Sequence, residues 1–531
     1  MLNVFGDAAH RAALRPALLS GTALLSAALF GLADPASADQ QFLKHGSLVI
    51  SSTTYDPTQG PLASLAAGST LPNTATATTQ AVAGNNYVTV WNNASVDGSF
   101  GATSAIQLTD IDLSNGKVFR SMQVPTDQVV TSFSSKSELG LHVLNNWPTV
   151  SVTFVGYAGA APANGLNPPA VGVGLIDVSN SDAVPGQDVT NPVTFAFGNT
   201  YAFRRTIVSV NEKGSINYTP TNDYGGNNGR SALLGPNGLY YMVGNANNGN
   251  AADFESTSGQ TTNHTTPDVT TTTGVEVVNP IGASVVNATI ASASSAEVDP
   301  LIQLTFPGKK PDKAGKDNNY RGITEFGGAL YFTKGSGSNG IDTVYTVQAP
   351  NSLPTLANAA SSTIAVVPGF PTDSAKATGG NFTPFAVFFA NPTTMYVSDE
   401  GTGNATDAST NAGLEKWTLG SDGKTWQLQY VLKKGLIGVV DANVTGSSGP
   451  WPAITTIGLR NLTGRINGDG TVTLWATTST SSASGDNGAD PNKVVEITDQ
   501  IAATQLSGNE SFTTVAGPVY GTAFRGVGFV E

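Results

Sequence analysis

Short runs in which apolar and polar residues alternate recur along the chain, separated by turns rich in Gly, Asn and Pro. Residues 239–244 read LYYMVG directly after the turn Pro236-Asn237-Gly238, and residues 330–333 read LYFT. Alternation with a period of two places every second side chain on one face, which is typical of half-buried β-strands. The pattern predicts an all-β chain of many strands joined by turns.

The strands group into a four-part unit that recurs along the chain. Each copy has a short apolar first strand and a second strand that carries an aromatic residue and leads into a Gly/Asn/Ser-rich loop. A third strand opens near Gly-aliphatic, and a fourth often ends at Pro-Gly or Ala-Gly. Successive second strands begin at Leu239, Leu330, Met395 and Leu474. This irregular spacing argues against a solenoid, whose coils stack at near-constant length, and it predicts a β-propeller of four-stranded blades.

The chain ends one strand into a new unit, at residues 523–529. Strands that complete this unit are available at residues 47–51, 105–109 and 118–122. Pairing of the two ends within one blade closes the ring and leaves no free sheet edge, so we expect that arrangement. First strands are predicted near Leu139, Ser231, Gly322, Phe385, Asn461 and Gly526. Six blades are favoured, with seven possible if residues 201–218 form a blade of their own rather than the outer part of the second.

Three stretches resemble those of secreted bacterial β-propeller-like proteins: residues 316–322 (KDNNYRG), 333–340 (TKGSGSNG) and 396–401 (YVSDEG). The resemblance covers nearly the whole chain after residue 38. It implies a propeller fold and an extracellular or periplasmic location. It implies no activity and no catalytic residues.

The first 38 residues predict a secretory signal peptide. Arg11 and Arg15 precede or open an apolar stretch at residues 17–32, and residues 35–38 (PASA) form an A-x-A-like cleavage site. The alternative is a membrane-anchoring helix, but the stretch is short for a span, and no later segment is apolar enough to cross a bilayer. We therefore expect a signal peptide over residues 1–38 and a single propeller domain over 39–531.

Composition narrows the range of partners. The formal net charge of −13 argues against nucleic acid and against electrostatic adsorption to anionic membranes, because both need clustered Lys and Arg. The absence of cysteine excludes disulfides, thiolate metal sites and a cysteine nucleophile. The chain also has no His-Glu-x-x-His and no Gly-x-Ser-x-Gly sequence, which argues against a zinc hydrolase or an α/β-hydrolase.

Basic residues recur at one position of the repeat. Arginine stands at or near the start of four first strands, at Arg230, Arg321, Arg460 and Arg525. In a propeller the start of each first strand and the loop after each second strand meet around the axis on one face, where ligands usually bind. Lys334, Asp317, Asp399 and Glu400 belong to the loops expected on that face.

These residues permit two interpretations. A ring of guanidinium groups suits bidentate capture of a carboxylate or phosphate, and the loop carboxylates suit a hydroxylated ligand, with Ca²⁺ as a possible cofactor. Alternatively, the arginines pair with neighbouring carboxylates and lock blade to blade.

Three functions remain open. The preferred one is a secreted propeller that binds a polysaccharide, a small acid or a protein on this face. A carboxylate- or arginine-dependent hydrolase or lyase acting on an extracellular sugar, lactone or phosphate ester is the second, and an envelope or adhesive structural protein is the third.

Overall fold

The structure of the chain is a computed structural model. It describes residues 41–55, 103–146, 150–158, 193–194, 200–201, 203–225, 228–245, 254–257, 260–263, 274–286, 290–298, 319–335, 341–348, 352–372, 382–403, 412–446, 449–483 and 487–531. Within these ranges the regular structure is β, apart from a short 3-10 helix at Ala359–Ser361. The predicted signal segment, residues 1–38, lies outside the described residues, and so does Asp317.

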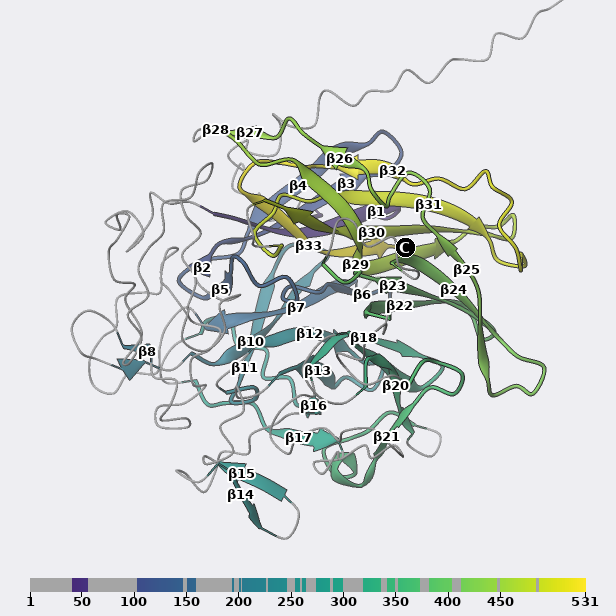
Figure 1. Cartoon of the computed structure of the whole chain (residues 1–531). Helices are drawn as coiled ribbons and strands as arrows, with labels where there is room; N and C mark the ends of the chain where they lie inside the picture. The colour runs from purple at the N-terminus through teal and green to yellow at the C-terminus, as the bar shows by residue number, and fades with distance from the viewer. Residues whose placement is uncertain are drawn as a thin grey trace, which may run out of the picture.

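Six antiparallel sheets stand in a ring and form a six-bladed β-propeller, which confirms the predicted fold class (Figure 1). From the axis outwards, the blades are, in order, β33 (Thr522–Val530), β1 (Ser47–Thr54), β3 (Ile106–Asp112) and β4 (Lys117–Gln123); β6 (His142–Leu144), β7 (Ser151–Ala158), β10 (Arg205–Asn211) and β11 (Ile216–Thr221); β12 (Gly229–Leu234), β13 (Tyr240–Gly244), β16 (Val275–Val278) and β17 (Ser295–Val298); β18 (Tyr320–Phe326), β19 (Ala329–Lys334), β20 (Thr343–Gln348) and β21 (Thr363–Val366); β22 (Pro384–Asn391), β23 (Thr394–Asp399), β24 (Gly413–Leu419) and β25 (Trp426–Leu432); and β29 (Ile454–Ile466), β30 (Thr471–Ser482), β31 (Val494–Gln500) and β32 (Thr513–Ala516).

Short strands supplement these blades. β5 (Val129–Ser132) pairs with the end of β7 and with β2 (Thr103–Ser104), and β26 (Val440–Asp441) pairs with β29. Three two-stranded ribbons stand apart from the blades: β8 (Val193–Thr194) with β9 (Thr200–Tyr201), β14 (Phe254–Thr257) with β15 (Gln260–Asn263), and β27 (Thr445–Gly446) with β28 (Gly449–Pro450).

The two ends of the described chain close the ring in the first blade. β33 pairs antiparallel with β1, from Ser47 opposite Val530 to Thr54 opposite Thr522. β3 and β4 then extend the sheet outwards, and Figure 1 shows purple β1 beside the yellow C-terminal strands. The predicted closure is confirmed. The predicted first strands are confirmed as well, and β10 and β11 show that residues 201–218 belong to the outer part of the second blade.

Apolar side chains fill the space between neighbouring blades. The rings of Phe326 and Phe389 stack between the fourth and fifth blades, with centroids 4.3 Å apart. Trp475 and Phe529 stack between the sixth blade and the first, at 5.3 Å. Each sheet therefore buries apolar side chains from both of its faces against its neighbours, which explains why second strands carry aromatic residues.

Candidate functional site

The arginine positions of the repeat coincide with irregularities in the inner strands. Arg230, Arg321, Arg460 and Arg525 each lie where the pairing between the first and second strand of their blade shifts register. A β-bulge inserts an extra residue, bends the strand locally and turns a side chain out of the regular alternation. The bulges therefore give these arginines a direction that a regular strand would not.

A hydroxyl group on the second strand holds the bulge in most blades. Thr333 Oγ1 accepts a hydrogen bond from Gly322 N at 3.2 Å and donates one to Phe385 O, in the next blade, at 2.6 Å. Ser51 likewise accepts from Gly526 N at 2.7 Å and donates to Leu139 O at 2.9 Å. Equivalent bonds to the next blade run from Ser398 to Arg460 O and from Thr477 to Arg525 O. The hydroxyls tie the innermost strands of successive blades into a continuous ring.

Glu400, directly after β23, collects three cations. Arg321 Nη1 lies 2.7 Å from its Oε1, and Lys136 Nζ and Arg460 Nε lie 3.3 Å and 3.5 Å from its Oε2. The side chains of Glu400, Arg321 and Arg460 are buried, whereas that of Lys136 is 36% exposed. These residues come from four blades, because Lys136 precedes β6 in the second blade. We call them the Glu400 cluster, and we call the side of the ring where first strands begin the arginine face.

The charges of the Glu400 cluster shift the proton affinity of its members. Burial alone raises the pKa of Glu400, but Arg321, Lys136 and Arg460 outweigh it and lower that pKa to about 2. Burial lowers the pKa of Lys136 to about 8; Glu400 opposes this shift, while Arg321 and Arg460 add to it. At neutral pH one carboxylate therefore faces three cations.

The other two arginines contact mainly carbonyl groups. Arg230 donates from Nη1 to Tyr320 O at 3.1 Å and from Nε to Asn228 Oδ1 at 3.2 Å. Arg525 donates from Nη2 to Gly488 O at 2.8 Å and to Phe133 O. Both side chains are buried and reach neighbouring blades. They occupy the same position of the repeat as Arg321 and Arg460 but have different partners.

The remaining predicted site residues separate. Lys334 ends β19 and is fully buried. Asp399 accepts hydrogen bonds from Thr383 N at 2.7 Å and Gly401 N at 2.8 Å, and burial raises its pKa to about 6. Asp399 and Glu400 are adjacent in sequence but hydrogen-bond to different partners. The structure thus brings Arg321, Arg460 and Glu400 together, and a ligand-binding role for any of the predicted residues stays a prediction.

A second buried glutamate has the opposite surroundings. Glu276 in β16 is fully buried, and neither of its carboxylate oxygens has a hydrogen-bond partner among the described residues. It lies directly across the sheet from Glu297. Burial, with added repulsion from Asp223 and Glu297, raises the pKa of Glu276 well above its ordinary value.

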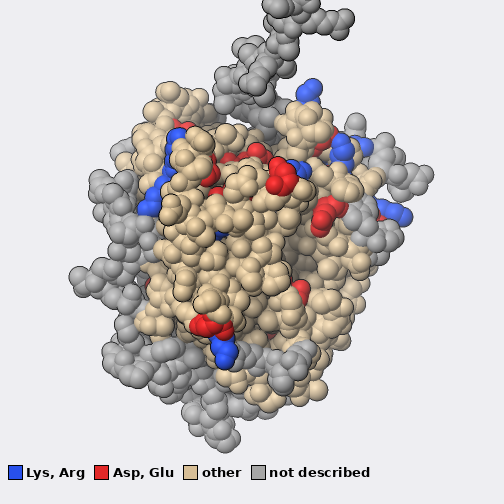
Figure 2. Space-filling view, turned by 90° about the vertical axis from the view of Figure 1, so that its right-hand side faces the viewer, with Lys and Arg blue, Asp and Glu red and all other residues tan. Residues whose placement is uncertain are grey.

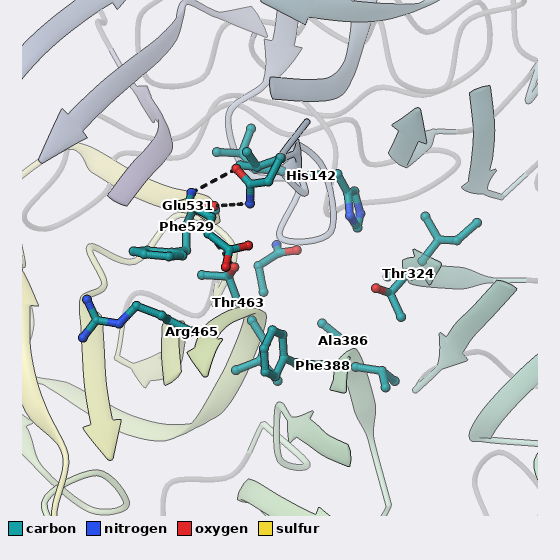
Figure 3. A pocket seen from close by; sticks show the side chains of 18 of the residues that line it. His142, Thr324, Ala386, Phe388, Thr463, Arg465, Phe529 and Glu531 are labelled. Carbon is teal, nitrogen blue, oxygen red and sulfur yellow. Dashed lines mark hydrogen bonds between the residues drawn. The ribbon is translucent and has the colours of Figure 1, made fainter. Parts of the chain in front are cut away.

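A cavity of about 270 Å³ lies on the propeller axis. Five of the six innermost segments line it, and in the strands that carry Arg321, Arg460 and Arg525 its lining residues follow the arginine, so it extends away from the arginine face. Figure 3 shows His142, Thr324, Phe388, Thr463 and Glu531 around it. We call it the axial cavity.

Sequence reasoning missed Lys136 and the axial cavity. Lys136 lies in a connecting segment outside the repeated pattern, so no repeat position identified it; its only signal was its closeness to the first strand of the second blade. The cavity residues lie on predicted first strands, but which of their side chains leave space between blades depends on packing.

Other chemistry is sparse in the described part of the chain. Among those residues no group of three or more His, Asp or Glu is placed to hold a metal ion. No helix there is long and apolar enough to cross a membrane. Figure 2 shows that charged side chains are few and scattered on the face it presents.

Comparison with known proteins adds little. No known protein family matches the chain, and no curated protein matches it. Two solved structures of the GH43_1 enzyme from Xanthomonas citri are similar. One, complexed with xylose, has 8% sequence identity, covers 63% of this chain and 90% of its own, and gives a TM-score of 0.23. The other has 10% identity, covers 62% and 90%, and gives a TM-score of 0.22. Similarity at this level carries no inference about activity.

Proposed function

We propose that this protein is an exported propeller that binds an acidic, hydroxylated ligand, such as a uronic acid unit of an extracellular polysaccharide, on its arginine face. The observation that carries the proposal is the Glu400 cluster: three cations share one carboxylate, and the ammonium group of Lys136 remains partly exposed. An incoming carboxylate gains a charge-assisted hydrogen bond there.

The surroundings of Lys136 support this choice of ligand. Arg321 and Arg460 lie behind it and are held by Glu400, so their positive charge acts on the ligand without a change in their geometry. Fixed charges in a partly desolvated site act more strongly than charges in open water. Export rests on the character of the first 38 residues. The function proposed is binding, and no catalytic step is assigned.

The test compares galacturonate with galactose, which have the same ring and differ in the carboxylate, by titration calorimetry. We expect the wild-type protein to bind galacturonate more tightly and Lys136→Met to lose most of that affinity, by about 1.5–3 kcal/mol if one charge-assisted contact is removed. Lys424→Met, in an exposed turn of the fifth blade, is the matched control and should bind as wild type.

Two results would count against this function. Galacturonate binding that is unchanged in Lys136→Met removes the Glu400 cluster as the site. Equal binding of galactose and galacturonate shows that the carboxylate is not recognised. Loss of thermal stability in Arg321→Ala, with no acidic ligand found, would favour the alternative in which the arginines only lock the blades together.

A further inference from the structure

The axial cavity has a polar wall with hydrogen-bonding capacity left over. Thr324 is partly exposed, its hydroxyl points into the cavity in Figure 3, and it makes no side-chain hydrogen bond to any described residue. Asn461 and His142 also line the cavity and are held in place, because Asn461 Nδ2 donates to Arg525 O at 2.7 Å and His142 Nε2 bonds Ser231 Oγ at 2.9 Å. Fixed amide, imidazole and hydroxyl groups are suited to recognising hydroxyl groups.

The opposite part of the wall is apolar. The ring of Phe388 faces the cavity in Figure 3, and Ile323 and Val387 line it as well. The volume of about 270 Å³ is close to the lower end of the range of about 300–1,000 Å³ that small-molecule sites cover. A compact molecule with an apolar C–H face and several hydroxyls matches this division of the wall, whereas a polymer chain does not fit.

The charges around the cavity exclude an anion. The carboxylate of Glu531 lies beside the cavity, whereas the side chain of Arg465 extends away from it in Figure 3. The Arg465 guanidinium lies over the rings of Trp475 and Phe529, at 5.8 Å and 5.5 Å. Burial lowers the pKa of His142 to about 4, so its imidazole is neutral at physiological pH. No cation in the described wall faces a bound molecule.

The cavity is formed before any ligand arrives. Its inner wall consists of strands that the hydroxyls of Ser51 and Thr333 tie to their neighbours. A Cβ at Gly322 would come within 2.4 Å of Phe385 O, so neighbouring inner strands approach each other closely there. A rigid, closely packed ring avoids the entropy cost of ordering a site on binding.

We propose that the axial cavity is a binding site for a small neutral polyol, a monosaccharide or its alditol, with Thr324, Asn461 and Glu531 contacting hydroxyls and Phe388 contacting the C–H face. This site is separate from the Glu400 cluster. The two sites lie on opposite sides of the bulged residues and select ligands of different charge.

The experiment uses three probes with the same ring: glucose, glucuronate and glucosamine, with sorbitol as the alditol. Saturation-transfer NMR at millimolar concentration detects binding to the full chain. We expect transfer to glucose or sorbitol, and none to glucuronate that survives in Lys136→Met. Thr324→Val removes only the hydroxyl and should weaken binding of the neutral probe about two- to tenfold, whereas Thr324→Ser should retain it. Thr324→Phe, which fills the cavity, should abolish it.

Lys136→Met separates this site from the proposed function, because it should leave binding of the neutral probe unchanged. The proposal is overturned if neither glucose nor sorbitol binds, or if binding persists in a folded Thr324→Phe protein. It is also overturned if glucosamine binds and glucose does not, since the site would then select a cation. Thermal unfolding of each variant shows whether a loss of binding is only a loss of fold.

Discussion

Glu400 and Glu276 are both buried between strands of a propeller blade, yet their proton affinities shift in opposite directions. Three cations around Glu400 lower its pKa to about 2, whereas Glu276 meets only burial and the carboxylates of Asp223 and Glu297, and its pKa rises. Burial therefore does not decide the charge state of an acid in this protein; the neighbouring charges do. The cations come from separate blades, so the ring as a whole keeps Glu400 ionised.

The comparison has a consequence for stability. An unfolded glutamate has a pKa of 4.5, so an ionised Glu400 favours the folded state above that pH. This contribution is lost as pH falls from 4.5 towards about 2. Glu276 acts in reverse, because its raised pKa in the folded state makes its burial cost more as pH rises above 4.5.

The largest expected effect is that of Glu400→Gln. The substitution leaves Arg321, Arg460 and Lys136 without their shared counter-charge, and breaking such a buried pair typically costs about 3–5 kcal/mol. Urea unfolding at pH 7 should show this loss. The variant should also lose the part of the wild-type fall in stability between pH 4.5 and about 2 that Glu400 contributes.

Glu212→Gln is the control for this comparison, since Glu212 makes no side-chain contact that the structure describes. If Glu400→Gln unfolds at the same urea concentration as this control, the Glu400 cluster does not hold the blades together.

A smaller effect of opposite sign is expected for Glu276→Met. Methionine has a similar length and brings no polar atom that lacks a partner, so removal of the buried carboxyl should stabilise the fold by about 1–3 kcal/mol. The gain should be greater at pH 8 than at pH 4.5, because the folded state of the wild type must hold this group against its tendency to ionise. Thermal unfolding at both pH values measures it. A loss of stability in Glu276→Met at pH 8 would show that the carboxyl has a stabilising partner.

The smallest expected change concerns Lys136. With a pKa of about 8, its amine should react with acetic anhydride at pH 7.5 faster than the exposed Lys424, as measured by peptide mass spectrometry. In Glu400→Gln the rate at Lys136 should increase further, because Glu400 is the group that raises its pKa. Equal rates at the two lysines in the wild-type protein would show that Lys136 is not perturbed.

The chain pattern alone determined the architecture of this protein. Alternating apolar residues and Gly, Asn and Pro turns are local signals, and they were sufficient to predict the four-stranded unit. Because each unit needs four strands, the unpaired strand at residues 523–529 required a partner near residue 47, and β33 does pair with β1. The site was predicted in part, since the repeat placed Arg321, Arg460 and Glu400 on one face.

Only the tertiary structure decided how those side chains pair. Lys136 and Glu400 lie 264 positions apart in the chain and belong to no common motif. The bulges at Arg321 and Arg460 break the period of two, so the pattern could not show where these side chains point. The charge states of Glu400 and Glu276, and the space left on the axis, follow from how blades distant in sequence pack against one another, and that packing leaves no local signal.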